Sequence, residues 1–231
     1  MLENWCAFLP GQVEGSTSGL LSADEALDVS FLPPMKRRRL SNLSRLSLRL
    51  AEVVAPDFQG YCVFGSQHGE LITTQKLLES IVQGEIVSPA GFSASVHNTA
   101  VGLHSINVRN TYSCTSLSAG IDTLAMCFVE ACALLETGEA QQVLLVCADD
   151  VVPEGLAGYV NKNEMRGFAA LVKPADNTVG RAVILSQTSA GNKPKKKDPI
   201  RSLVSFLGNT GQESVVVSGE TGQWRWQHNV S

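Results

Sequence analysis

Cys114 is the residue whose type and setting come closest to catalytic chemistry. It lies in "NTYSCTSLSAGIDTL", residues 110–124, among polar residues shortly before an expected helix. Many enzymes keep a thiolate nucleophile at such a place, because the amino terminus of a helix carries partial positive charge. The effect requires the thiol to lie in the first helical turn, and a histidine or another base normally assists the attack.

Nothing in the sequence supplies that assistance. The chain has four histidines, and their spacing places none of them near Cys114. An unassisted cysteine with a pKa near about 8.5 is mostly protonated at neutral pH. We therefore expect Cys114 to be a structural or partner-facing thiol. His97 and His104 could share one helix face, and we expect both to be structural histidines.

The six cysteines follow no ligand pattern. They include no CxxC pair and no cysteine–histidine spacing typical of a zinc site. Reduced, mostly buried thiols in the cytoplasm fit this irregular spacing better than disulfides do. The sequence therefore predicts neither a metal nor a bound cofactor.

The elements that must position Cys114 follow from the apolar pattern. Apolar residues at helical spacing predict helices over about 35–55, 71–83, 88–103, 118–136 and 198–208. Ser116 or Ser118 can cap the helix that begins at about 118. Short apolar runs predict strands at 5–9, 61–67, 107–115, 142–150, 167–174, 180–189 and 214–219, and the aromatic tail "QWRWQH" could form another strand or an interface.

Strands that alternate with helices of this length predict an α/β domain with a largely parallel sheet and helices on both faces. We expect one domain over residues 1–231. It would comprise a core at 1–190, a Lys-rich linker at 191–198, and a carboxyl-terminal helix with strands at 199–231.

Composition narrows the classes of function. A hydrophobic content of 44% with 17% charged residues favours a compact folded domain. The net charge of -4 argues against nucleic acid as the main ligand, despite the basic clusters "KRRR" at 36–39 and "KPKKK" at 193–197. No apolar run is long enough to span a bilayer, and the amino terminus does not resemble a signal peptide, so we predict no membrane insertion.

Three stretches carry a resemblance to a known family. They are "PPMKRRRLSNLSRLSL", "FGSQHGELITTQKLLESIVQGEIVSPAGFSASVHNTAVGLHSI" and "TSLSAGIDTLAMCFVEACALL". Together they resemble the β-ketoacyl synthase amino-terminal-like family, and more narrowly the chain-length-factor subunits of bacterial aryl polyene pathways. The resemblance implies the first half of a thiolase-type fold, truncated relative to a full ketosynthase.

The same resemblance implies an inactive site. Active ketosynthases carry their nucleophile in a T-A-C-x-x-G pattern, and matching through Thr115 and Gly120 places Leu117 at the nucleophile position. A register that makes Cys114 the nucleophile leaves no glycine in the expected place. The H-G-T-x-T and G-F-G-G motifs of the second half are also missing, and a leucine cannot attack a thioester.

The partners follow from the resemblance as well. It implies a heterodimer with an active ketosynthase, in which the strand at about 107–114 pairs across the two-fold axis and side chains line a shared acyl tunnel. The residues implied at the interface or tunnel are Asn107, Arg109, Thr111, Tyr112, Cys114, Thr115, Ser116, Leu117, Ile121, Phe92, Val96 and Ala100. An acidic acyl carrier protein would dock by charge on Lys36, Arg37, Arg38 and Arg39.

Two other functions stay open at this point. One is a stand-alone acyl-transfer enzyme that uses Cys114, which would be labelled rapidly by iodoacetamide and inactivated by Cys114→Ala. The other is a binding module whose basic helix docks an acidic protein or nucleic acid, with an affinity that falls steeply with salt.

Overall fold

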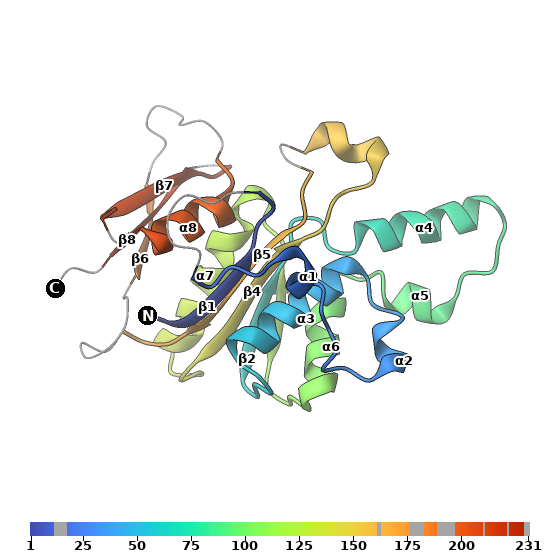
Figure 1. Cartoon of the computed structure of the whole chain (residues 1–231), viewed down its shortest axis with the longest axis horizontal. Helices are drawn as coiled ribbons and strands as arrows, with labels where there is room; N and C mark the ends of the chain where they lie inside the picture. Colours follow the sequence, from blue (N-terminus) through green and yellow to red (C-terminus); the bar gives the residue numbers. More distant parts are fainter. Residues whose placement is uncertain are drawn as a thin grey trace.

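The computed structural model describes residues 1–11, 18–160, 163–175, 183–188, 197–209, 211–220 and 222–228. Within these residues the strands form two sheets, one of five strands and one of three (Figure 1). The strands are β1 (Leu2–Phe8), β2 (Tyr61–Gly65), β3 (Cys114–Leu117), β4 (Val143–Asp149), β5 (Arg166–Val172), β6 (Val183–Thr188), β7 (Ser214–Ser218) and β8 (Gln223–His228).

The larger sheet has the strand order β1-β5-β4-β2-β3. Strand β2 pairs in parallel with both β3 and β4, whereas β5 is antiparallel to β4 and to β1. Four strands therefore run in one direction, and β5 alone is reversed between β4 and β1. The expected largely parallel sheet is corrected to a mixed sheet. The described part of the connection from β4 to β5, residues 150–160 and 163–165, contains a 3-10 turn (Glu154–Tyr159) but no crossover α-helix of the kind that joins parallel strands.

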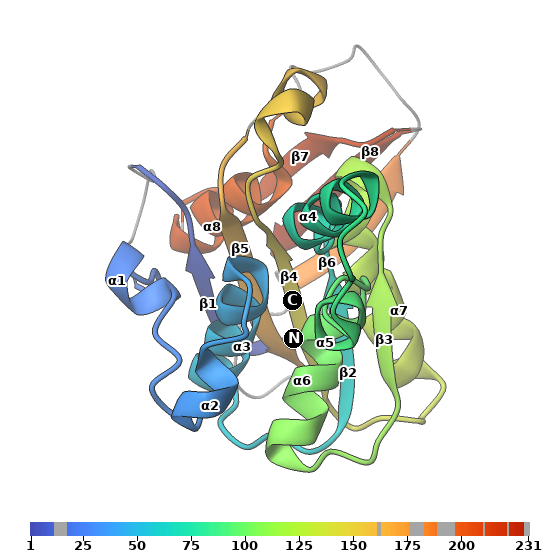
Figure 2. The same cartoon turned by 90° about the vertical axis from the view of Figure 1, so that its right-hand side faces the viewer.

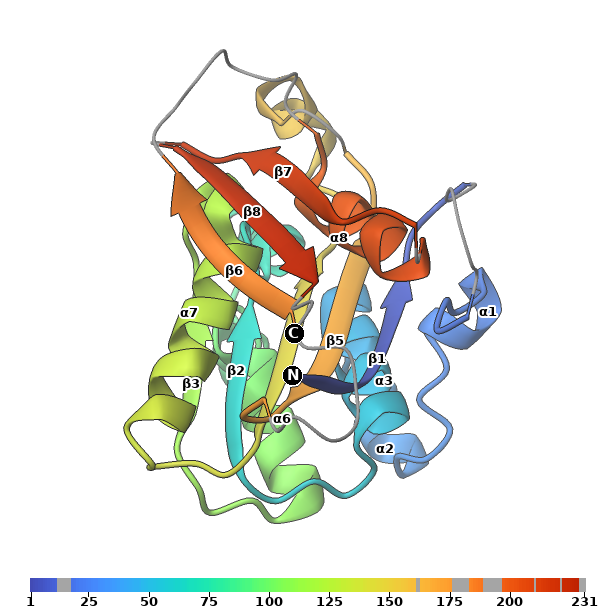
Figure 3. The same cartoon turned by 90° about the vertical axis from the view of Figure 1, so that its left-hand side faces the viewer.

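Helices cover both faces of this sheet, as predicted. The helices are α1 (Ala23–Ala26), α2 (Pro34–Arg37), α3 (Asn42–Val54), α4 (Leu71–Val82), α5 (Pro89–Ser93), α6 (Thr99–Val108), α7 (Thr123–Glu136) and α8 (Pro199–Gly208), with 3-10 turns η1 (Gly120–Asp122) and η2 (Glu154–Tyr159). Figure 2 is viewed from the side of α3 and α6, and Figure 3 from the side of α8 and the second sheet.

Successive side chains of β4 point to opposite faces of the larger sheet, and each face packs in its own hydrophobic core. Val143, Leu145 and Cys147 pack with the α7 and α8 side, and Leu144 and Val146 pack with the α3 side. All residues of β4 are buried, which explains its uniformly apolar sequence. The sheet is thus the middle layer between two sets of helices.

The second sheet has the order β6-β8-β7 and is antiparallel throughout. Trp224 and Trp226 of β8 are buried and join the same core cluster as α7 and α8. The aromatic tail is therefore a strand that packs its rings on the domain. Residues 191–196 of the expected Lys-rich linker lie outside the described residues, and the single-domain organisation remains a prediction.

Three expected elements are divided differently. The helix predicted over 35–55 is two helices, α2 and α3, because Ser41 caps α3 by accepting a hydrogen bond from the Ser44 backbone N–H at 2.9 Å. The helix predicted over 88–103 is broken between α5 and α6. The strand predicted over 107–115 begins only at Cys114, because α6 continues to Val108 and ends at Arg109 in the left-handed region (φ 56°).

Helices α4 and α5 form an arm that projects from the domain, to the right in Figure 1. We call residues 71–96 the arm. Its helix α4 matches the helix predicted over 71–83, yet neither α4 nor α5 has a single buried residue. The apolar residues of the arm are thus not accounted for by the core of this chain.

Candidate functional site

The site is built on the turn that leads from β3 into α7. Leu117 is the last residue of β3, and Gly120 opens the 3-10 turn with a φ of 55°, which glycine adopts without strain. The Thr123 hydroxyl accepts a hydrogen bond from the Ala119 N–H (3.0 Å) and donates one to the Gly120 carbonyl (2.7 Å). These bonds fix the turn before α7 begins.

The tip of the β7–β8 hairpin packs on this turn. The Asp122 carboxylate accepts a hydrogen bond from the Trp224 indole N–H at 2.8 Å and another from the Glu220 N–H at 3.1 Å. Gly219 of the hairpin lies against the same carboxylate. The carboxyl-terminal sheet is therefore anchored at the amino terminus of α7.

The expected serine cap on α7 is wrong. Asp122 occupies the position before α7 and makes no capping bond with its side chain, because its carboxylate is committed to the hairpin. The Ser118 hydroxyl donates to the Gln67 carbonyl at 3.1 Å, and Ser116 points toward a histidine.

Leu117 is half-buried and packs against the core cluster on the α7 side. Its side chain holds no group that could attack a thioester. Cys114 lies at the opposite end of β3 and outside the first turn of α7, where the sequence places it. The amino terminus of α7 therefore does not act on its thiol.

The surroundings of Cys114 nevertheless differ from the expectation. Its sulfur lies 3.4 Å from the Asn110 Nδ2 and 3.3 Å from the Ser105 hydroxyl, and the Cys62 thiol faces it from β2. The Cys62 thiol is the largest contributor among these hydrogen-bonding groups, and together they lower the pKa of Cys114 to about 6. The thiol is therefore not the mostly protonated group that the sequence suggested.

His97 lies beside the end of β3. Its Nε2 is 2.9 Å from the Ser66 carbonyl oxygen and its Nδ1 is 2.7 Å from the Ser116 hydroxyl. Because a carbonyl only accepts, Nε2 donates to Ser66, and the Ser116 hydroxyl lies against both Nδ1 and the His97 carbonyl oxygen (3.3 Å). The histidine thus ties the segment between α5 and α6 to both β2 and β3, and this role was not visible in the sequence.

A buried polar network continues from His97 through the sheet. The Ser66 hydroxyl donates to the Asp149 carboxylate at 2.9 Å, and the Gln67 N–H donates to the same oxygen at 2.7 Å. Arg166 then bridges Asp149 (3.5 Å) and Asp198 (3.0 Å), with all three side chains almost fully buried. The sequence analysis did not predict this network, and of the two aspartates that end "QVLLVCADD" only Asp149 belongs to it.

His104 stays structural, as expected. It is buried in α6 with its ring centroid 5.6 Å from that of Phe64. Burial lowers the pKa of His104, since the charged ring loses hydration.

Strand β3 has one free edge among the described residues. The carbonyls of Ser113 and Leu117 accept hydrogen bonds from the N–H groups of Cys62 (3.3 Å) and Ser66 (3.1 Å) on β2. Backbone groups alternate in direction along a strand, so those of Cys114 and Ser116 face away from β2. This edge can accept one further strand.

The implied interface residues divide into three groups. Cys114, Thr115, Ser116 and Leu117 form β3; Phe92 and Val96 are exposed on the arm or just after α5; and Asn107, Arg109, Thr111, Tyr112 and Ile121 lie at the end of α6, in the following loop or in η1. Ala100 is the exception. It is 8% exposed and packs in the core of its own chain, so it does not face a partner.

The arm carries the largest group of exposed apolar side chains among the described residues. Val82 is 87% exposed and Ile86 is 99% exposed. The other large apolar side chains exposed there are Leu78, Ile81, Phe92 and Val96. A concentration of exposed apolar side chains on one projecting segment is typical of an interaction site.

Glu70 holds the base of the arm. Its buried carboxylate accepts hydrogen bonds from the hydroxyls of Ser41 and Ser44 at 2.7 Å each, and from that of Thr73 at 3.1 Å. These bonds join the start of α4 to the start of α3. The arm is therefore attached to the domain by a fixed connection.

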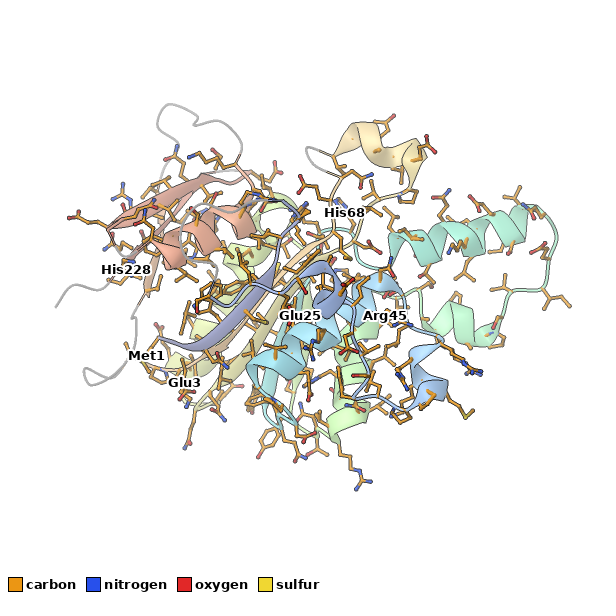
Figure 4. All side chains as sticks on the ribbon, in the orientation of Figure 1. Met1, Glu3, Glu25, Arg45, His68 and His228 are labelled. Atoms are coloured by element: carbon orange, nitrogen blue, oxygen red, sulfur yellow. The ribbon has the colours of Figure 1, made fainter. Side chains whose placement is uncertain are left out.

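The basic cluster lies at α2 and the turn after it. Lys36, Arg38 and Arg39 are exposed, and none of them forms an ion pair within the described residues. Arg37 is half-buried, and its carbonyl accepts a hydrogen bond from the Arg45 guanidinium at 2.7 Å (Arg45 is labelled in Figure 4).

Two other kinds of feature are absent from the described residues, a metal site and a membrane-spanning helix. Among the described residues, no set of three or more histidine, cysteine, aspartate or glutamate side chains is arranged to hold a metal. None of the described helices combines the length and apolar character needed to cross a membrane.

The family model for the β-ketoacyl synthase, N-terminal domain, matches residues 13–227. The chain belongs to this family, and the expected thiolase-like ketosynthase fold is confirmed. No protein of curated function matches the sequence.

Solved structures place the chain more narrowly. The ketosynthase ApeO in complex with its chain length factor ApeC, from Xenorhabdus doucetiae, is similar with a TM-score of 0.81 and 25% identity, and the match covers 98% of each chain. The ishigamide ketosynthase/chain length factor has a TM-score of 0.56 at 17% identity, covering 78% of this chain and 54% of that chain.

A β-ketoacyl synthase from Burkholderia phymatum STM815 also has a TM-score of 0.56, at 11% identity, covering 87% of this chain and 57% of that chain. At these lower identities the likeness shows the fold alone. The chain spans little more than half the length of these last two proteins, whereas it spans nearly all of the chain matched in the ApeO–ApeC complex.

Proposed function

We propose that this chain is the non-catalytic, chain-length-factor subunit of a heterodimeric ketosynthase. It completes the acyl tunnel of an active partner and sets the chain length of the product. By its likeness to the ApeO–ApeC complex and by the resemblance in its sequence, the pathway is aryl polyene biosynthesis, with cytoplasmic location and an acyl carrier protein as the second partner.

The observation that carries the proposal is the likeness to a chain of the ApeO–ApeC complex together with Leu117 at the nucleophile position. The match covers 98% of both chains, so the two correspond over nearly their whole length. A leucine in place of the reactive cysteine fits the chain-length-factor role in such a complex and not the ketosynthase role.

The turn after β3 supports an inactive site. In the register carried by Thr115 and Gly120, the nucleophile position is Leu117, and a leucine cannot form an acyl-enzyme. The Asp122 carboxylate at the start of α7 is a second obstacle, because its negative charge opposes an oxyanion developing at the same helix terminus.

The free edge of β3 and the arm support a partner. Pairing across this edge would extend the sheet into the second subunit, and the arm would lie over the partner's surface. Burying a large aliphatic side chain contributes roughly 1.5–3 kcal/mol, so side chains as exposed as Val82 and Ile86 would supply much of the association energy. The free edge of β3 and the exposed side chains of the arm are thus the proposed contact surface.

Chain-length control has a simple physical basis. Side-chain volume at the closed end of a tunnel limits how many units fit before overpacking stops growth. Phe92, Val96, Leu117 and Ile121 are the tunnel residues we propose, and Ala100 is removed from that set by its burial. Replacing Phe92 with Ala should lengthen the product, and replacing Val96 with Trp should shorten it.

Carrier-protein docking rests on the three exposed cations at α2. Lys36, Arg38 and Arg39 offer an unpaired positive surface to an acidic partner. Arg37 is half-buried and contributes less. Charge reversal at Lys36 and Arg39 should slow association with the carrier protein, and the effect should shrink as salt is raised.

The central test is co-expression with the ketosynthase encoded by a neighbouring gene. The two chains should co-purify as a 1:1 complex, and extension of an acyl thioester should require both. Ala in place of the partner's reactive cysteine should abolish activity, whereas Cys114→Ala here should leave it intact. A stable monomer that ignores the ketosynthase would refute the proposal.

A matched pair of variants tests the contact surface. Val82→Glu with Ile86→Glu places charge on the exposed arm and should weaken the complex by about 100-fold or more. Ile184→Glu changes an exposed apolar residue on β6 in the other sheet and should leave the affinity unchanged. Equal effects of the two changes would show that the arm is not the interface.

The lowered pKa of Cys114 favours one second candidate function, a stand-alone acyl-transfer enzyme that uses this thiol as its nucleophile. No histidine is among the hydrogen-bond partners of this thiol, so the residues that the structure describes place no general base beside it. An acyl group transferred onto Cys114 of the isolated chain, with turnover that Cys114→Ala abolishes, would favour this candidate over the partner subunit.

A further inference from the structure

Two cysteines face each other at the edge of the larger sheet. Cys62 of β2 and Cys114 of β3 are directly opposite in the parallel register. Both belong to the α3 and α6 side of the sheet, so their side chains point to the same face. Neighbouring strands are about 4.8 Å apart, which lies within the Cα separations of roughly 4.4–6.8 Å that disulfides span.

One amide group bridges the two sulfurs. The Asn110 Nδ2 lies 3.4 Å from the Cys114 sulfur and 3.7 Å from the Cys62 sulfur. The side-chain oxygen of Asn110 accepts the Gly60 N–H at 3.1 Å, and its Nδ2 donates to the Gly60 carbonyl at 2.8 Å. The amide is therefore fixed to the loop before β2, with its N–H₂ group directed at the thiol pair.

The two thiols differ in character. The contacts of the Cys114 sulfur with the Cys62 thiol, the Ser105 hydroxyl and the Asn110 amide lower the pKa of Cys114 to about 6. The pKa of Cys62 is raised by its contact with Cys114 and by burial, and its thiol donates to the Gly60 carbonyl at 3.4 Å. A half-exposed thiol of lowered pKa thus lies beside a buried thiol of raised pKa.

We propose that Cys114 and Cys62 form a peroxide-reactive dithiol site, in which Cys114 is oxidised by hydrogen peroxide or an organic hydroperoxide and Cys62 resolves the product to a disulfide. This reactivity goes beyond the proposed subunit function and does not depend on it. It needs only the two strands, Asn110 and an oxidant of the hydroperoxide class.

The chemistry balances in two steps. The Cys114 thiolate attacks one peroxide oxygen, the O–O bond breaks, and the leaving alkoxide or hydroxide takes a proton from water. The sulfur is oxidised by two electrons to a sulfenic acid while the peroxide is reduced. The Cys62 sulfur then attacks Cys114, an S–S bond forms, the S–O bond breaks, and the departing hydroxide takes the Cys62 proton to leave as water.

The remaining cysteines supply the contrast. Cys132 is exposed on α7 but its pKa is raised, and burial raises the pKa of Cys6 to about 12. Exposure alone therefore does not select the oxidised thiol. If the groups around Cys114 make it the thiol that peroxide oxidises, Cys114 should be oxidised at least about tenfold faster than Cys132 at pH 7, because a larger fraction of it is thiolate.

The test uses the full chain, reduced and then treated with one to two equivalents of hydrogen peroxide at pH 7. Peptide mapping without reductant should show a Cys62–Cys114 disulfide that dithiothreitol reverses. Cys62→Ser should stop at a Cys114 sulfenic acid, trapped by dimedone, and Cys114→Ser should leave Cys62 as a free thiol. Cys132→Ser, the matched control, should behave as the unmodified chain.

Two results would overturn the site. One is oxidation of Cys132 as fast as that of Cys114, and the other is over-oxidation of Cys114 to the sulfinic acid with no disulfide to Cys62. Because Cys62 is buried, its variant can fail to fold. The peptide map of the unmodified chain decides the question in that event, since both outcomes are read directly from it.

Discussion

Gly219→Ala should loosen the hairpin from the turn after β3. A Cβ at this position would overlap the Asp122 Oδ1 and would lie 3.0 Å from the Trp224 Nε1. The hairpin must therefore move away from the carboxylate that accepts hydrogen bonds from Trp224 and Glu220. The substitution tests whether this contact holds the carboxyl-terminal sheet in place.

The magnitude follows from the bonds at risk. A hydrogen bond to a charged group contributes about 1.5–3 kcal/mol, so losing one of the two should lower the free energy of unfolding by about 2–3 kcal/mol. For a chain of this size that corresponds to a fall of roughly 4–12 °C in Tm. Urea denaturation followed by tryptophan fluorescence would measure it, since Trp224 and Trp226 both lie in this sheet.

Gly211→Ala is the matched control. Its nearest neighbour is the Asn209 Oδ1 at 3.6 Å, which is ordinary contact, so its free energy of unfolding should stay within about 0.5 kcal/mol of the parent. In Asp122→Ala the overlap is gone, and adding Gly219→Ala should then have little further effect. Equal stabilities of the Gly219 and Gly211 variants would refute the reasoning.

Three further outcomes are expected. Arg166→Met should lower the free energy of unfolding in urea by about 3–5 kcal/mol, because it leaves the buried carboxylates of Asp149 and Asp198 without their cation. Burial lowers the pKa of His104 in the folded chain. Below the ordinary histidine pKa of about 6.5 the unfolded chain therefore binds more protons than the folded chain, and the free energy of unfolding should fall as pH drops through about 6.5. His104→Gln should make that fall smaller. Alkylation of Cys114 by iodoacetamide should rise with pH and reach half its maximal rate near pH 6, and a midpoint near 9 would show that the donors do not stabilise the thiolate.

Local periodicity accounts for the elements that the sequence predicts well. The leucines of α3 and the apolar stripe of α7 face a sheet, so their spacing carries the information directly. Periodicity predicts one helix over residues 88–103, but the structure has two helices there. They are separated at His97, whose ring contacts Ser66 and Ser116. The partners of that histidine lie on other strands, so no local pattern reports them.

The reversal of β5 is a second limit. Its residues are as apolar as those of β4, since both strands are covered on two faces, and burial does not encode direction. The placement of Cys114 in a strand was accessible from the sequence, whereas Leu117 lies beyond the strand predicted over 107–115 and is the last residue of β3. The character of Cys114 was not, because Cys62 reaches it only through strand pairing.

The arm also has a consequence for how much of this protein a cell retains. Protein quality control recognises exposed aliphatic surface, and an unassembled copy presents it continuously on a firmly attached projection. Surplus molecules should therefore be degraded or held by chaperones until the proposed partner subunit covers them. Stoichiometry would then be enforced after translation, without any need for matched synthesis.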